Sequence, residues 1–180
     1  MNDLLRRPAV WAVFTIVLAL VLAVALYLFQ PWRLFIDRTV DEAAPGAVST
    51  GTAEPAGGAR GRQGPRTLAT GQLISHEHET SGTVQVLRLE DGSRVLRIED
   101  LRTSDGPDLR VWLSDQPVKE GPAGSRAFRN GESVDLGALK GNQGSQNYPI
   151  PTEADLDRLT SMSIWCRAFS VSFGAAELKA

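Results

Sequence analysis

Hydrophobic and polar residues alternate near the C-terminal end of the chain, as they do in a β-strand. From residue 162 to residue 168 the even-numbered positions are apolar or small, and the odd-numbered ones are polar except for Trp165. The apolar residues then move to odd-numbered positions from Phe169 onward. A period of two indicates a strand that buries one face, and a change of phase cannot keep both halves on that face. We therefore predict a β-bulge or bend between Arg167 and Phe169.

The same alternation recurs upstream and predicts a series of short strands. The Asp91-Gly92 pair separates two of them and is typical of a type I′ hairpin turn. A change of phase in the strand before that turn predicts another bulge. Short strands divided by turn signals favour an all-β fold, either an antiparallel sandwich or a barrel-like domain. The expected strands cover residues 67–74, 83–89, 94–101, 109–114 and 134–137.

Some stretches depart from this alternation. Residues 117–131 and 141–150 are rich in glycine, proline or polar side chains, which predicts loops. Thr152 is followed by acidic residues and predicts the N-terminus of a helix of one or two turns. Trp112 and Trp165 fall on the side of their strands that faces away from the aliphatic residues, so we expect the two indoles to cover a second layer.

An uncharged apolar stretch of 22 residues, Pro8 to Phe29, lies near the N-terminus. At about 1.5 Å per residue, a helix of this length would cross a hydrocarbon core of about 30 Å. We interpret it as a signal-anchor, with residues 1–7 as a cytoplasmic tail and the rest of the chain outside the cell membrane. The alternative is a cleaved signal peptide, for which Ala23-Val24-Ala25 offers a site.

The residues after this stretch divide into a linker and a folded domain. Residues 30–66 start with a juxtamembrane segment and continue with a stretch rich in Gly, Ala, Pro, Ser and Thr, which predicts a disordered linker. Residues 67–180 then form the β domain, which is long enough for one modest core. The formal net charge of −2 gives no sign of a nucleic-acid partner.

The sequence contains one cysteine, Cys166, inside the predicted C-terminal strand. One cysteine cannot form an internal disulfide in an oxidising compartment, so it is a free thiol, a ligand or half of an intermolecular bridge. A buried cysteine that acts only as a small hydrophobic residue is the structural alternative. No catalytic signature surrounds Cys166, and whether the domain is an enzyme stays open.

Metal and haem sites are the cofactor hypotheses that the residues allow. His76 and His78, with Cys166 and Met162, contain the ligand types of a blue-copper site. Because no His or Met follows Cys166, the order of these ligands disfavours copper. The motif for covalent haem attachment, C-x-x-C-H, is absent from the sequence, whereas a haem bound through the Cys166 thiolate is chemically allowed.

Residues 71–177 resemble the DM-thirteen domain family, which is also called the electron-transfer DM-thirteen domain. The order and spacing of several short segments together carry the resemblance. These segments are His78–Thr83, Gly106–Leu113, Asp135–Gly141, Gly144–Pro151 and Ser163–Cys166 with the apolar residues that follow.

The resemblance implies an extracytoplasmic β-rich domain whose single cysteine acts in redox chemistry, as a bare thiol or as a ligand to a group such as haem. It places the role on Cys166, with Trp165 and Tyr148 as neighbours in a cofactor site. The electron partner would be a separate membrane redox protein, since the family's companion modules are absent from this sequence. The competing hypothesis is a non-enzymatic binding or adhesion domain in which Cys166 belongs to the core.

Overall fold

The computed structural model describes residues 8–29, 37–46 and 64–180. The chain divides into two units, one before and one after the boundary between residues 36 and 37, and each is described by itself. The predicted tail at residues 1–7 and most of the predicted linker, residues 30–36 and 47–63, lie outside the described residues.

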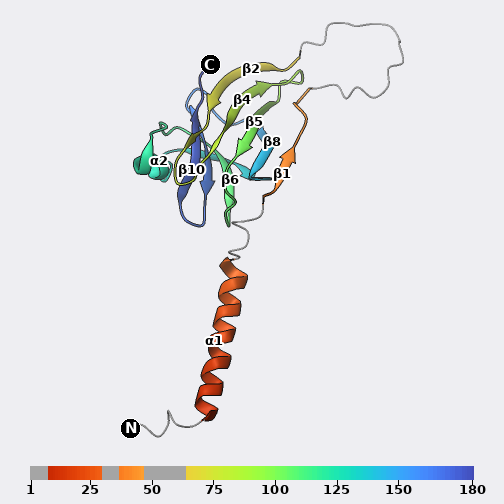
Figure 1. Ribbon diagram of the computed structural model, residues 1–180. Coiled ribbons are helices and arrows are strands. Elements are labelled where there is room, and N and C mark those ends of the chain that lie inside the picture. Colours follow the sequence, from red (N-terminus) through yellow and green to blue (C-terminus); the bar gives the residue numbers. More distant parts are fainter. Residues whose placement is uncertain (1–7, 30–36, 47–63) are drawn as a thin grey trace, which may run out of the picture. The chain divides into compact units, whose positions relative to one another are not determined.

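The predicted apolar stretch forms a single helix, α1, with the expected bounds Pro8–Phe29 (Figure 1). Its side chains are apolar on every side, and those of Trp11, Phe14 and Leu22 are more than half exposed. No helix within the described residues is both long enough and apolar enough to traverse a bilayer. The helical prediction is therefore confirmed, but the structure does not show the predicted membrane span.

The second unit is mostly β and is built from two five-stranded sheets in a sandwich-like arrangement, which confirms the predicted β-rich class. The β8 sheet has the strand order β1-β8-β5-β4-β2 (Figure 1). The β9 sheet has the order β3-β10-β9-β6-β7. In the first sheet the strands are β1 (Thr39–Asp41), β2 (Arg66–Gln72), β4 (Ser81–Arg88), β5 (Arg94–Arg102) and β8 (Gln143–Ile150). In the second they are β3 (Ile74–Ser75), β6 (Leu109–Ser114), β7 (Ser133–Ala138), β9 (Ser161–Cys166) and β10 (Val171–Glu177).

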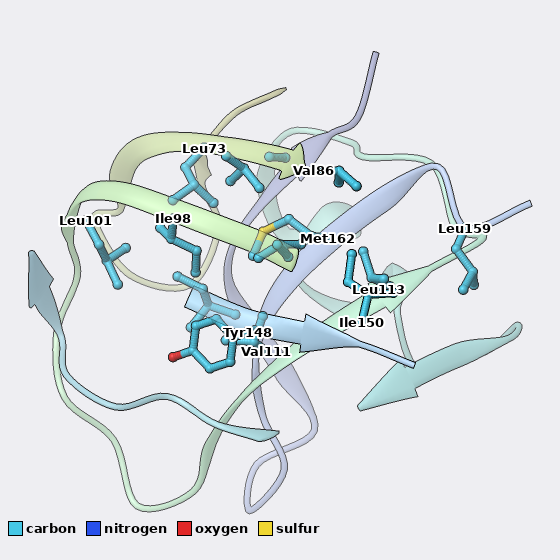
Figure 2. Close-up of a cluster of buried hydrophobic side chains, with 14 of the residues drawn as sticks. Leu73, Val86, Ile98, Leu101, Val111, Leu113, Tyr148, Ile150, Leu159 and Met162 are labelled. Atoms are coloured by element: carbon cyan, nitrogen blue, oxygen red, sulfur yellow. The ribbon is translucent and has the colours of Figure 1, made fainter. Parts of the chain in front are cut away.

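One hydrophobic core fills the space between the two sheets. Side chains from both sheets point into a common interior in Figure 2, among them Ile98 and Tyr148 from the β8 sheet and Val111 and Met162 from the β9 sheet. All four are at most 2% exposed. Burial of apolar surface on this scale is the main favourable contribution to folding, at roughly 25 cal/mol per Å².

Turn geometry differs from the predictions in two places. The β4–β5 hairpin forms around Asp91-Gly92, but of these two residues only Gly92 has a positive φ (+83°), and the Gly92 amide donates to the Leu89 carbonyl. This is a type I turn that ends in a left-handed glycine, not type I′. The phase change after residue 166 reflects a hairpin turn at residues 167–170 between β9 and β10, so the predicted bulge within one strand is wrong.

Three loop and helix predictions are also wrong. Residues 143–150, which we expected to be a polar loop, form β8 between β1 and β5. Turns replace the helix expected at Thr152. A short helix, α2 (Gly121–Ala127), forms instead inside the stretch predicted as a loop, and its first turn contains Pro122.

Part of the predicted linker belongs to the domain. Strand β1 lies within residues 30–66 and pairs in parallel with β8, with Val40 opposite Gly144. Because β1 and β2 belong to the same sheet, residues 47–63 connect two strands of the domain instead of joining the domain to α1. The folded unit therefore begins near Asp37, upstream of the predicted start at residue 67.

The pairing of β1 with β8 predicts different effects for two glycine substitutions. Gly144 has φ +92°, and a Cβ there would lie 2.1 Å from the Val40 carbonyl oxygen. Gly137 has φ +125°, and no atom lies within 4 Å of a Cβ built there. An alanine at this position therefore measures the cost of backbone strain without a steric clash. We expect Gly144→Ala to lower the free energy of unfolding by roughly 1–3 kcal/mol more than Gly137→Ala, measured by urea denaturation. Equal losses would show that β1 contributes little to stability.

Candidate functional site

Cys166 is the last residue of β9, the central strand of its sheet. It pairs with Leu109 on β6 and with Val171 on β10, and its side chain is 0% exposed. It belongs to the same core cluster as Met162 and Ile164, which lie on the same face because side chains alternate along a strand. The expectation that Cys166 lies inside a C-terminal strand is therefore confirmed, and its side chain is buried.

An exposed turn follows Cys166 directly in the sequence. The chain leaves the core one residue later, and residues 167–170 of the turn are all exposed. The Arg129 side chain fastens this turn by donating from Nε to the Ser170 carbonyl at 2.7 Å. Arg167 forms an ion pair with Asp108 at 2.7 Å on the neighbouring loop. Two side-chain contacts near the surface thus hold the turn that directly follows Cys166 in the sequence.

Trp165 points away from Cys166, to the outer face of the β9 sheet. Its indole stacks on Trp112 with ring centroids 5.0 Å apart and an interplanar angle of 22°. Phe128, which follows α2, covers this pair together with Ala175. The expected second layer over the indoles is confirmed, but Trp165 and Cys166 cannot line one pocket because they face opposite sides of β9.

Tyr148 lies on the other sheet, within the core. Its hydroxyl donates to Gln146 Oε1 at 2.7 Å and accepts from the Lys140 amide at 3.1 Å. Burial raises the pKa of Tyr148 to about 12, so the phenol stays protonated. These contacts tie β8 to the connection that precedes it. They explain the position of Tyr148 without a bound cofactor.

His76 is held on the outer face of the β9 sheet. Its Nε2 lies 2.9 Å from the Lys119 carbonyl, which can only accept, so Nε2 carries the hydrogen. Its Nδ1 lies 2.9 Å from the Ser172 hydroxyl, to which Ser163 also donates at 2.9 Å. Ser163 and Cys166 point to opposite faces of β9, so the imidazole of His76 is not brought to the thiol.

The other predicted metal ligand, His78, has a different environment. Its ring lies over Phe173, with centroids 3.8 Å apart. Within the described residues no group of three or more His, Cys, Asp or Glu side chains could hold a metal ion. The blue-copper ligand set considered for His76, His78 and Cys166 is therefore not assembled in the described part of the chain.

The surroundings of Cys166 also do not fit a haem. A thiolate-ligated haem needs an open coordination direction and a large apolar slot beside the sulfur. Here the Cys166 side chain is 0% exposed and packs within the core cluster. A haem would have to displace core side chains, which argues for a bare thiol.

Two surface grooves lie elsewhere on the domain, and neither contains a predicted site residue. One, of about 690 Å³, is lined by Gln72, Thr83, Gln85 and Glu120, among others. The other, of about 540 Å³, lies beside Leu68, Val86 and Arg88 and is lined by apolar and polar side chains in similar measure. Thr70 and Gln72 on β2, like Thr83 and Gln85 on β4, stand two residues apart in the sequence, and this spacing could have identified the polar residues of the first groove.

Burial of the two imidazoles has a consequence for stability. Burial lowers the pKa of His76, against the raising effect of its bond to the Lys119 carbonyl, and burial likewise lowers the pKa of His78. The unfolded chain then binds protons more readily than the folded one, so stability falls as the pH drops below about 6.5. We expect His76→Gln to flatten this loss, measured by urea denaturation between about pH 7 and pH 5. An unchanged slope would contradict the role assigned to burial.

Comparison with known proteins now gives the family. No curated protein and no solved structure matches the chain significantly. A family model described as "Electron transfer DM13" matches residues 72–178, which includes both His76 and Cys166 and every strand from β4 to β10. This match covers more than half of the chain and agrees with the resemblance seen in the sequence. The chain therefore belongs to the electron transfer DM13 family.

Proposed function

We propose that this chain is an electron-transfer domain held at a membrane, in which Cys166 acts as a bare redox-active thiol. Membership of the electron transfer DM13 family supports the general function. The observation that supports the residue is the position of the sole cysteine, at the end of the central strand and one residue from an exposed turn. A thiol at this position is buried in the folded domain and is close in sequence to residues that contact solvent.

Burial decides which chemistry is open to Cys166. A partner sulfur cannot reach a side chain that is 0% exposed, so reaction requires the turn at residues 167–170 to open. The partner is a protein disulfide. The Cys166 thiol loses its proton to solvent, and the thiolate forms a mixed disulfide with one partner sulfur. The bond between the two partner sulfurs breaks, and the other sulfur leaves as a thiolate. Two electrons thus pass from the Cys166 sulfur to the leaving sulfur, and Cys166 stays joined to the partner in the mixed disulfide.

The membrane location rests on α1. A helix that is apolar on all sides needs an apolar environment, and α1 exposes large hydrophobic side chains between Trp11 and Tyr27. Residues 8–29 are the proposed contact with the membrane, with the β domain outside the cytoplasm. The electron partner is then a separate redox protein at the same membrane.

A second candidate function is a binding domain in which Cys166 is structural. The complete burial of this side chain in the hydrophobic core favours it. In that case Cys166→Ala costs roughly 1–3 kcal/mol of stability through a small cavity and leaves function intact. Cys166→Ser costs more, because the buried hydroxyl lacks a partner in an apolar cluster.

Thiol labelling separates the two candidates. We expect iodoacetamide to modify Cys166 in the native protein, at a rate limited by opening of the turn. Arg129→Ala removes the bond to the Ser170 carbonyl and should speed labelling about fivefold, the effect of one lost hydrogen bond.

Arg94→Ala is the matched control, because Arg94 fastens a different loop by donating to the carbonyls of Pro151 and Thr152. It should leave the labelling rate unchanged. The structural cysteine would be favoured if labelling occurs only when the whole domain unfolds. In that case Arg129→Ala speeds labelling no more than its loss of stability predicts.

The membrane location has its own test. We expect the full chain to stay with the membrane fraction after carbonate extraction, because insertion of an apolar helix does not depend on charge. A variant that lacks residues 8–29 should move to the supernatant. Release of the full chain by carbonate would contradict insertion of α1, whatever the thiol does.

A further inference from the structure

Strand β1 occupies a site on the edge of β8 that is built to hold an extended backbone. We call this site the β8-edge slot and define it by Arg97, Lys140, Asn142, Gly144 and Asn147. In the slot the Gln143 amide donates to the Arg38 carbonyl at 3.2 Å, and the Glu42 amide donates to the Ser145 carbonyl at 2.8 Å. The occupant is therefore held mainly through its main chain.

Side chains of the slot add further contacts to the main chain of the occupant. Asn142 Oδ1 accepts from the Arg38 amide at 2.7 Å. Arg97 Nη1 donates to the Glu42 carbonyl at 3.0 Å, and Asn147 Nδ2 donates to the Ala43 carbonyl at 2.9 Å. These contacts fix the register of the segment but select few of its side chains.

The slot also has a shape that suits a bare backbone. Gly144 lies so close to the occupant that a Cβ would come within 2.1 Å of the Val40 carbonyl oxygen. At Gly141 a Cβ would lie 2.4 Å from the Arg38 carbonyl oxygen. The two glycines thus let the incoming strand approach β8 at hydrogen-bonding distance.

Two carboxylates of the occupant are recognised by side chains of the slot. Asp37 accepts from Asn142 Nδ2 at 2.9 Å, and Glu42 makes the larger set of contacts. The Glu42 carboxylate accepts from Lys140 Nζ at 2.6 and 2.9 Å and from the Asn147 amide at 2.7 Å. The hydrogen bond from Lys140 is the largest of the effects that lower the pKa of Glu42, so the carboxylate is charged in the slot at neutral pH. The slot therefore fits an extended segment that places a carboxylate at this position.

The occupant is separable from the rest of the domain. Strand β1 has three residues, and none of its side chains belongs to the buried core. It lies outside the family match, which begins at residue 72. Residues 47–63 separate it from β2, so its connection to the domain is long enough to allow other positions of the strand.

We propose that the β8-edge slot is a strand-acceptor site and that residues 37–43 of a second copy of this chain bind in it by reciprocal exchange. Exchange replaces every contact of β1 with the same contact in the other copy, so no interaction is lost. The balance between the closed and exchanged forms then depends on chain entropy and on the local concentration of copies. The proposal is independent of the redox role of Cys166.

Disulfide trapping between two differently tagged, co-expressed full-length copies tests the exchange. One copy carries Thr39→Cys and the other Gln143→Cys, at positions that pair directly in the parallel register. Neighbouring strands lie about 4.8 Å apart, which is within reach of a disulfide. We expect a bond between residues 39 and 143 of different copies, identified by mass spectrometry of the linked peptides.

A matched control replaces Gln143→Cys with Ser133→Cys, on an exposed strand at the edge of the β9 sheet. Random collisions form the 39–133 bond, so exchange should give the 39–143 bond in about tenfold excess. The single-chain variant with both Thr39→Cys and Gln143→Cys sets the oxidation conditions. The proposal is overturned if this variant forms the 39–143 disulfide within one chain while the 39–143 disulfide between copies is no more abundant than the 39–133 control. Residues 37–43 then bind only to their own domain.

Discussion

Burial of β9 from both sides is the constraint on which the rest of the domain depends. The strand is central in its sheet, and all six of its residues are buried. The core between the sheets covers one face, and Phe128 with the indole pair covers the other. Each side chain of a strand in this position lies either in the core or under the second layer. Cys166 and Trp165 are on opposite faces of β9, so they lie in separate environments.

The parts of the fold that follow from a period of two could be predicted from the sequence. Strand β6 is an example, because Leu109, Val111 and Leu113 all face the core. Strand β8 could not be predicted this way, since its polar residues satisfy one another inside the protein. Gln146 is 0% exposed because its side-chain amide bonds with the Gly141 carbonyl and the Lys140 amide of the preceding connection, and the alternation of residue types gives no sign of these bonds.

The candidate site was predictable only in part, for a related physical reason. Alternation places Cys166 in the core, but a phase change looks the same in sequence whether the strand kinks or the chain reverses direction. The short turn between β9 and β10 contains Ser170 with φ +53°, a conformation that is uncommon for serine and that the sequence does not announce. The separation of the imidazoles from the thiol follows from this tertiary arrangement, which residue types and spacing do not encode.

The hydroxyl of Ser172 has one hydrogen and two groups that can receive it, the Nδ1 of His76 at 2.9 Å and the Gly174 carbonyl at 3.0 Å. A neutral imidazole takes this hydrogen and leaves the carbonyl without it. A charged imidazole donates its Nδ1 hydrogen to the Ser172 oxygen. The Ser172 hydroxyl can then donate to the Gly174 carbonyl. The ionisation of a ring near the surface thus reverses the polarity of a hydrogen-bond chain beneath the second layer, and it does so without moving a heavy atom.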